Sequence, residues 1–116
     1  MDTNLVEKWI EYHQAQNQEL FWAWEQLDEA VHESPREAFE CILIIAQSTS
    51  DPRVLSNLGA GPLEDLLVYH GAEYIDQIET KARQLPTFTQ VVKSVWKNNM
   101  SKDVWERVNA IQAKYS

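Results

Sequence analysis

Apolar residues recur at intervals of three and four positions along nearly the whole chain. This spacing places them on one face of an α-helix, and no stretch shows the clean apolar and polar alternation of a half-buried strand. We therefore predict an all-α fold, either a compact bundle or a short array of antiparallel helical hairpins, with a loosely HEAT-like stack left open. Seven or eight short helices are expected, over residues 5–18, 19–33, 35–48, 52–59, 61–69, 72–85, 87–97 and 102–115.

Proline, glycine and small polar residues mark the expected helix ends. The run Ser34-Pro35-Arg36-Glu37 predicts a helix start with a capping box, in which Ser34 is the N-cap and Glu37 follows three residues later. Gly59 and Gly71 are expected to end helices, because glycine readily takes the left-handed conformation found just after a helix. Two further N-caps are expected at Asp51 and Ser101.

The third expected helix should be the hub of the fold. Its centre, Cys41 to Ala46, is apolar on all sides, as is typical of a helix surrounded by others. Ile42 and Ile45 are therefore expected to be almost completely buried. Cys41 is expected to fill a small buried space, and as the only cysteine it cannot form an internal disulfide. Three tryptophans on or beside apolar stripes are assigned to the core: Trp9, Trp96 and Trp105.

The length of 116 residues fits one domain, 1–116, which can bury a core without disulfides or metals. Hydrophobic residues make up 44% of the chain and charged residues 24%, so disorder is not expected. The N-terminus, Met1-Asp2-Thr3-Asn4, lacks the basic stretch and apolar run of a signal peptide, and the longest apolar run is too short to span a bilayer. We therefore expect a soluble, cytoplasmic protein.

The negative charge of the chain is concentrated in its first third. The formal net charge is −8, and residues 1–40 hold ten acidic and two basic side chains, whereas residues 41–116 hold eight of each. A field of this sign attracts basic partners and repels nucleic acid and anionic membranes. Direct binding of DNA or RNA is not expected, because it depends on Lys and Arg side chains that neutralise phosphates.

Residues 59–71 form the most motif-like segment, in which Gly59-Ala60-Gly61 is followed by Glu64, Asp65 and His70. Neither the spacing of a phosphate-binding loop nor that of a dinucleotide-binding loop is present. Helix ends explain the same residues, because acids favour the N-terminal end of a helix and histidine the C-terminal end. No histidine has a second His or Cys at helical zinc-site spacing. We therefore predict no catalytic residue, no metal and no cofactor.

The segment Leu58-Gly59-Ala60-Gly61-Pro62-Leu63-Glu64-Asp65-Leu66-Leu67, followed by His70-Gly71, resembles a bacterial family of small helical domains of unknown function, as does the upstream run Phe21-Trp22-Ala23-Trp24-Glu25. The resemblance covers about Leu20 to Trp105. It implies a bacterial origin and an all-helical domain, and it brings no catalytic roles with it. Small acidic bacterial proteins of this kind also resemble immunity proteins and toxin inhibitors. This resemblance is an analogy in size, charge and fold, and such an analogy does not establish function.

Trp22 is the candidate for a binding residue. On a helical wheel it points nearly opposite to the apolar stripe of Leu20, Trp24, Leu27 and Val31. An aromatic side chain surrounded by carboxylates is typical of charge-steered protein interfaces. The alternative is that this helix is covered on both sides, so that Trp22 packs against a neighbouring helix. The predicted partner-binding set consists of Trp22, Glu19, Gln26, Glu29 and Glu33.

Three function classes follow, in order of preference. The first is a non-catalytic acidic domain that docks on a basic protein partner, as an inhibitor or immunity protein covering a toxin or a nucleic-acid-binding enzyme. The second is a helical adaptor or regulatory domain that binds a peptide or a helix in a groove. The third is a small hydrolase-like enzyme that uses the region of Glu64, Asp65 and His70. The pattern sets neither the oligomeric state nor the identity of the partner.

Overall fold

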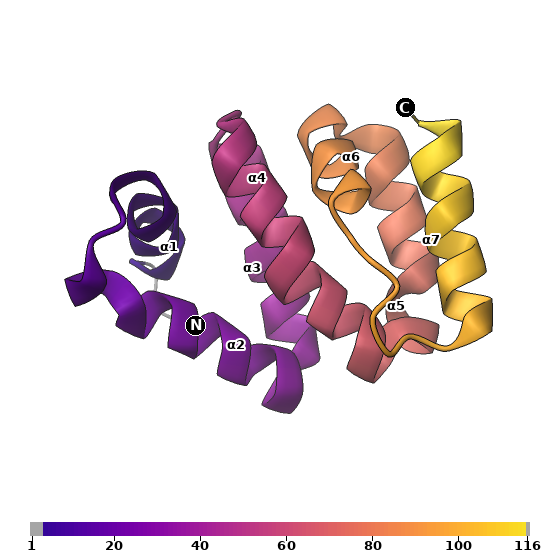
Figure 1. Cartoon of the computed structure of the whole chain (residues 1–116), viewed down its shortest axis with the longest axis horizontal. Coiled ribbons are helices and arrows are strands. Elements are labelled where there is room, and N and C mark those ends of the chain that lie inside the picture. The colour runs from indigo at the N-terminus through magenta and orange to yellow at the C-terminus, as the bar shows by residue number, and fades with distance from the viewer. Residues whose placement is uncertain (1–3, 116) are drawn as a thin grey trace.

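The computed structural model describes residues 4–115, and over this range the chain forms helices and no strand, as predicted (Figure 1). A 3₁₀ turn, Gln18–Leu20, leads into α2, and a π-helical turn, η2, Gly59–Leu63, joins α4 to α5. The α-helices are α1 Leu5–Ala15, α2 Phe21–Glu33, α3 Pro35–Ser48, α4 Pro52–Leu58, α5 Glu64–Gln84, α6 Pro86–Lys93 and α7 Lys102–Lys114.

The expected number of seven or eight separate helices is wrong. Helical structure is continuous from Pro52 to Gln84, so the three helices predicted there are one rod, and residues 4–115 hold six separate helices. The error lies in the role given to Gly59 and Gly71, which were expected to end helices in the left-handed conformation. Neither glycine has a positive φ, and both lie inside the rod.

The two glycines instead allow other helices to approach the rod closely. A Cβ atom on Gly59 would overlap the carbonyl oxygen of Val91 in α6, and a Cβ atom on Gly71 would lie 2.8 Å from a methyl group of Val104 in α7. A side chain at position 59 would push the α6 backbone away from the rod, and a side chain at position 71 would displace Val104 of α7. The rod thus meets α6 at one glycine and α7 at the other.

Pro62 lies inside the rod without ending it. Proline has no N–H group to donate and normally breaks or kinks an α-helix. Here the turn is widened, and the N–H of Glu64 donates to the carbonyl of Gly59, five residues earlier, as in a π-helix. A second irregularity follows at His70, whose φ of −137° and ψ of 21° kink α5 directly before Gly71.

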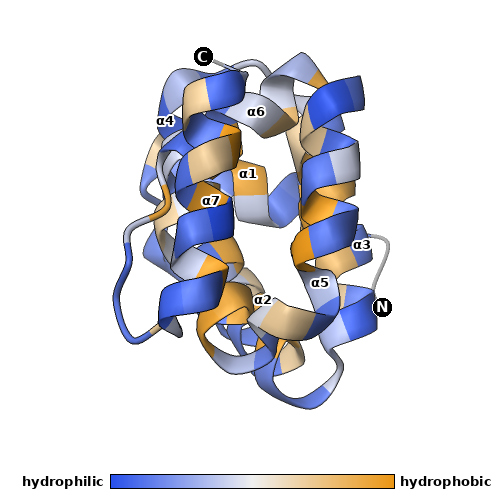
Figure 2. Ribbon diagram, turned by 90° about the vertical axis from the view of Figure 1, so that its right-hand side faces the viewer, coloured by the Kyte–Doolittle hydropathy of each residue, from blue (hydrophilic) through white to orange (hydrophobic). Residues whose placement is uncertain are grey.

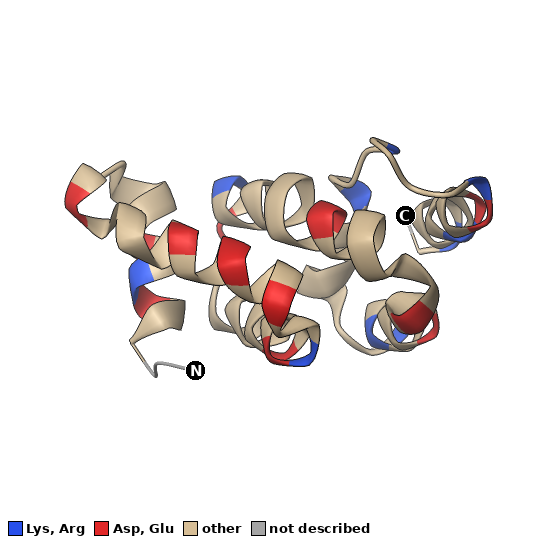
Figure 3. Cartoon of the chain, turned by 90° about the horizontal axis from the view of Figure 1, so that it is seen from below, with Lys and Arg blue, Asp and Glu red and all other residues tan. Residues whose placement is uncertain are grey.

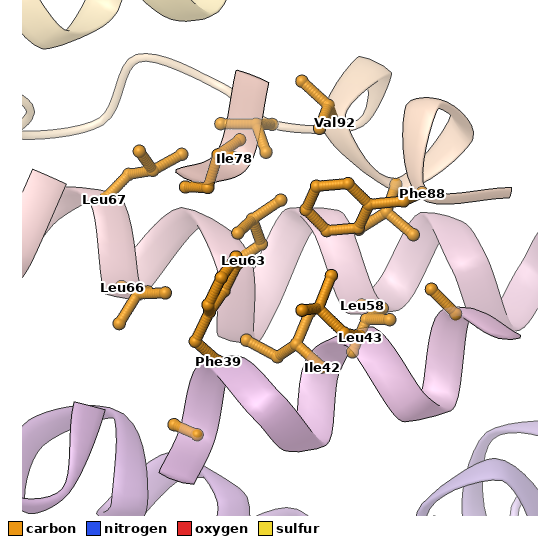
Figure 4. Close-up of a cluster of buried hydrophobic side chains, with 14 of the residues drawn as sticks. Phe39, Ile42, Leu43, Leu58, Leu63, Leu66, Leu67, Ile78, Phe88 and Val92 are labelled. Carbon is orange, nitrogen blue, oxygen red and sulfur yellow. The ribbon is translucent and has the colours of Figure 1, made fainter. Parts of the chain in front are cut away.

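Helix α3 is the hub that the sequence predicted. It contacts α1, α2, α4, α5 and α6, and Ile42 and Ile45 have no exposed surface. Apolar side chains from α3, the rod and α6 meet in one cluster (Figure 4), while polar residues cover the outer faces of the helices (Figure 2). Cys41 is buried as expected, and burial raises the pKa of its thiol to about 11.

The tryptophans divide between core and surface. Trp9 is fully buried and Trp105 packs partly buried against the core, as expected. The core assignment of Trp96 is wrong, because 74% of its surface is exposed. Helix α6 ends at Lys93 and not at residue 97, so Trp96 lies in the following loop and is not on the apolar face of the helix. In the part of the chain that the structure describes, no helix is long and apolar enough to cross a membrane.

The expected capping box at Ser34 is not formed. Ser34 occupies the N-cap position, but its side chain makes no capping hydrogen bond, and its φ of −139° and ψ of 62° depart from the usual geometry of a capping serine. Its backbone N–H instead donates to Ala30, which couples the end of α2 directly to the start of α3. Asp51 and Ser101 do cap their helices, through Arg53 N–H at 2.9 Å and Val104 N–H at 3.2 Å.

The glycine contacts predict a large effect for one alanine substitution and a small effect for another, at two glycines that are two residues apart. Gly59→Ala should destabilise the fold by about 2 kcal/mol or more, because the added methyl group collides with the α6 backbone. Gly61→Ala should change stability by less than about 1 kcal/mol, since its site is open and the gain in helix propensity is opposed by crowding against the following proline. Urea unfolding of both variants measures the difference, and equal losses would contradict the close contact at Gly59.

The caps predict a second contrast, between two serines. Ser101→Ala should lower the free energy of unfolding by about 0.5–2 kcal/mol, because the hydroxyl oxygen accepts the Val104 N–H group. Ser34→Ala should cost clearly less, since no capping bond is lost. Thermal melts of the two variants at one pH compare them directly. A larger loss at Ser34 would show that its hydroxyl caps α3 after all.

Candidate functional site

Helix α2 separates its residues into an inner and an outer face. Ala23, Leu27 and Val31 have no exposed surface and face α1 and α3, with which α2 packs. They recur every four residues and so form one inner stripe, whereas the residues on the opposite side are exposed or partly exposed. That outer face carries Trp22, Glu25, Gln26, Glu29 and Glu33, and we call it the α2 face.

Trp22 lies on the surface and not in the core. It is 38% exposed, which places it among the exposed residues of α2, although more than half of its side chain is covered by neighbouring residues. Phe21 beside it is 39% exposed and stacks on Trp24, with ring centroids 5.2 Å apart and an angle of 12° between planes. Tyr12 of α1 contacts Phe21 from the other side, at 6.0 Å. The start of α2 therefore presents two partly exposed aromatic side chains, Trp22 and Phe21, and the ring of Phe21 contacts Trp24 and Tyr12.

Carboxylates follow this aromatic group along the α2 face. Glu25, Glu29 and Glu33 are exposed and stand four residues apart, a spacing of about 6 Å along a helix. Helix α2 contains no Lys or Arg, and Figure 3 shows its acidic positions following one another without a basic neighbour on the helix. Among the described residues none of the three has an ion-pair partner within 4.0 Å. Their charge is therefore free to act on a partner.

The predicted set differs from this face at its edges. Trp22, Glu29 and Glu33 lie where the wheel placed them, whereas Gln26 is only partly exposed. Glu19 is exposed but belongs to the 3₁₀ turn before α2, where its N–H donates to the side chain of Asn17. Sequence reasoning missed Glu25 and Phe21. The same wheel would have found them, because both point away from Leu27.

A second acidic strip lies where α2 meets the start of α5. Asp65 of α5 is partly buried, and its pKa is raised, first by burial and then by the negative charges of Asp28 and Glu64, against an opposing effect of His32. His32 in turn contacts the ring of Tyr69 at 4.5 Å, and Tyr69 is 58% exposed. The negative field of α2 thus extends onto α5 with a further exposed aromatic residue.

Comparison with known proteins places the chain in a family. Residues 11–116 match the model of a family described as a family of unknown function (DUF6869). The chain belongs to this family. No curated protein and no solved structure matches it. The DUF6869 membership agrees with the expected small domain of unknown function, and it attaches no reaction or partner to any residue of the site.

The motif-like segment of this DUF6869 chain is used for packing. The carboxylate of Glu64 is buried and accepts hydrogen bonds from Trp96 N–H at 2.9 Å and Asn98 Nδ2 at 3.0 Å. His70 lies at the kink of α5 and lines a hollow with Gly71, Glu73 and Ser101. Asp65 lines a different, smaller hollow, with Trp24, Asp28, Gly61 and Pro62. Glu64, Asp65 and His70 are therefore directed to different places.

No metal centre is formed by the described part of this DUF6869 chain. Over residues 4–115, no three His, Cys, Asp or Glu side chains stand together in a way that could hold a metal ion. The ring centroids of His13 and Trp9 lie 4.1 Å apart with the rings tilted by 54°, and burial lowers the pKa of His13. His32 lies near Asp65, where α2 meets α5, and His70 lines the hollow beside Ser101. The three histidines therefore occupy three separate environments.

The raised pKa of Asp65 predicts that its charge costs stability. In the folded state the charged form is disfavoured relative to the unfolded state, so this cost is present at neutral pH and disappears as pH falls below the pKa of the unfolded chain. Asp65→Asn should therefore raise the melting temperature at pH 7, and the gain should vanish near pH 3. The exposed Glu73→Gln on the same helix is the control. A gain at both pH values, or in the control alone, would contradict the assignment.

Proposed function

We propose that the protein is a non-catalytic binding domain whose α2 face docks on a basic surface of another protein. The observation that carries the proposal is Trp22, exposed next to a row of carboxylates that have no basic partner on a helix without Lys or Arg. Aromatic side chains supply most of the binding energy at interfaces when they become buried. Carboxylates around them speed the encounter with a positive partner and select against negative ones.

The partner that fits best is a protein whose basic surface normally contacts phosphates, such as a toxin or another nucleic-acid-binding enzyme. One carboxylate per 6 Å gives the row of Glu25, Glu29 and Glu33 about half the linear charge density of one DNA strand. Asp28 and Asp65 add charge beside this row. Charge mimicry is then partial, and the aromatic group at the start of α2 supplies the remaining affinity. An inhibitor or immunity protein would act in this way, by covering the phosphate-binding surface.

An adaptor that binds a peptide or helix in a groove is the second proposal, and the structure gives it less support. Such a groove is expected to be mainly apolar. The hollow between α4 and α6 has two apolar residues in its lining, Leu55 and Pro52, and they stand among Ser50, Ser56, Gln90, Lys93 and Ser94, so its apolar surface is interrupted by polar side chains. A hydrolase-like role is supported least, because the carboxylate of Glu64 is occupied by two hydrogen bonds to the loop before α7.

The proposal is tested by separating burial from charge on the α2 face. The wild-type chain and its variants serve as baits in affinity capture from the source cell, followed by binding kinetics with the basic protein recovered. Trp22→Ala should weaken binding by about 2 kcal/mol or more, because a buried anchor is lost, with little change in the melting temperature. Ile44→Ala on α3, where Ile44 is 50% exposed, is the matched control and should leave binding unchanged.

Charge reversal should act on a different kinetic constant. Glu29→Lys and Glu33→Lys should mainly lower the association rate, and this effect should shrink as salt shortens the Debye length to about 8 Å at physiological ionic strength. Glu106→Lys on α7 is the control for net charge. The proposal fails if Trp22→Ala lowers the melting temperature steeply while both reversals leave association unchanged, because Trp22 would then be a packing residue.

A further inference from the structure

The loop that joins α6 to α7, residues 94–101, carries the most exposed large apolar side chain among the described residues. Trp96 has 74% of its surface open to solvent, about twice the exposed fraction of Trp22. Val95 directly before it is buried, and so is Met100 four residues later, whereas residues 97–99 are exposed like Trp96. Trp96 therefore lies on an exposed stretch of the loop between two buried residues.

The backbone that presents Trp96 is fixed at three points. The side-chain amide of Gln112 donates to the carbonyls of Val92 and Val95, both at 3.0 Å, at the start of the loop. The buried carboxylate of Glu64 accepts the N–H of Trp96 itself and the side-chain amide of Asn98. The Ser101 cap on α7 fixes the end. A fixed backbone reduces the ordering cost of binding through an exposed aromatic anchor.

The exposed charges nearest to Trp96 along the chain are the lysines at positions 93 and 97, whose sign is opposite to that of the acids on the α2 face. The acid that lies directly at the loop, Glu64, is buried and hydrogen-bonded. Lys93 ends α6 and Lys97 follows Trp96, and within residues 4–115 neither has an ion-pair partner within 4.0 Å. Lys102 starts α7 and pairs with Glu106 at 4.0 Å. We call Trp96 with Lys93 and Lys97 the Trp96 surface.

We propose that the Trp96 surface of one molecule docks on the α2 face of a second copy of the chain. Each surface combines exposed aromatic rings with charges of one sign, and the two signs are opposite. The proposal rests on the α2 face being a docking surface, and it goes beyond the proposed function by assigning a second surface and a second occupant. Lysines would meet the row of Glu25, Glu29 and Glu33, and the indole of Trp96 would meet the rings of Trp22 and Phe21.

The two surfaces cannot satisfy each other within one molecule. The loop between α6 and α7 and the helix α2 lie apart in both Figure 1 and Figure 3. Contact between copies therefore joins two different surfaces, either reciprocally in a two-fold dimer or head-to-tail in a ring or open chain. A basic partner bound to the α2 face would displace the neighbouring copy, so that partner binding and self-association exclude each other.

Sedimentation velocity of the purified chain tests the association without any other ligand. At about 20 mM salt the weight-average mass should rise with protein concentration, and at about 0.5 M salt the rise should largely disappear, because screening weakens the lysine–carboxylate attraction. Trp96→Ala should lower the association constant roughly tenfold or more at the lower salt concentration. Ile44→Ala, which removes an exposed side chain from α3, should leave it unchanged.

A charge exchange identifies the two surfaces as partners. Lys93→Glu with Lys97→Glu should abolish self-association, and so should Glu29→Lys with Glu33→Lys. Mixing these two variants in equal amounts should restore it, because each acidic surface then meets a basic one on the other variant. All four positions are exposed, and thermal melts check that each variant is folded.

The outcomes separate this inference from the proposed function. A wild-type chain that stays monomeric at every concentration, an association that Trp96→Ala leaves intact, or a mixture that does not reassociate overturns the proposed contact between the Trp96 surface and the α2 face. Capture of the basic partner from the source cell does not depend on Lys93 or Lys97, so the Lys93→Glu, Lys97→Glu variant should retain it. Loss of partner capture in Glu29→Lys, Glu33→Lys supports the α2 face even where self-association is absent.

Discussion

The rod from Pro52 to Gln84 can meet two other helices at short range only because Gly59 and Gly71 have no side chains. At the first position α6 lies with its backbone against the rod, and at the second α7 rests its Val104 on it. These contacts hold the end of α6 and the start of α7 against the rod, and the loop that carries Trp96 joins the two. The bond from Glu64 to that loop depends on the same placement.

The surfaces that we assign to binding consist of exposed side chains that are not part of the buried core. Helix α2 contributes Ala23, Leu27 and Val31 to the interior, and no other helix covers its outer side. The exposed parts of Trp22, Phe21 and Trp96 add nothing to the free energy of folding, because apolar surface stabilises the fold only when it is removed from water. Opposite charges beside these aromatic groups give each surface a preferred type of partner.

Sequence reasoning predicted the features that depend on spacing along one helix. The helical period predicted the all-α class and the buried pair Ile42 and Ile45, and it placed Trp22 opposite the apolar stripe of α2 without deciding whether a neighbour covers it. It failed where a residue's role depends on a distant part of the chain. Glycines at 59 and 71 were interpreted as helix ends, because close contact with another helix leaves no local signal in the sequence. The outward turn of Trp96 depends likewise on Glu64, 32 residues earlier in the chain.

The π-helical turn Gly59–Leu63 lets the rod hold one extra residue without changing the direction in which its second half faces. Each residue of a π-turn rotates the chain by less than the roughly 100° of an α-helix, so five residues span about the rotation that four span in an α-turn. Glu64 therefore stays on the side of the loop before α7, and Asp65 stays on the side of Asp28. If the same residues were wound as a regular α-helix, every residue after the turn would be rotated by about 100°, and neither contact could form.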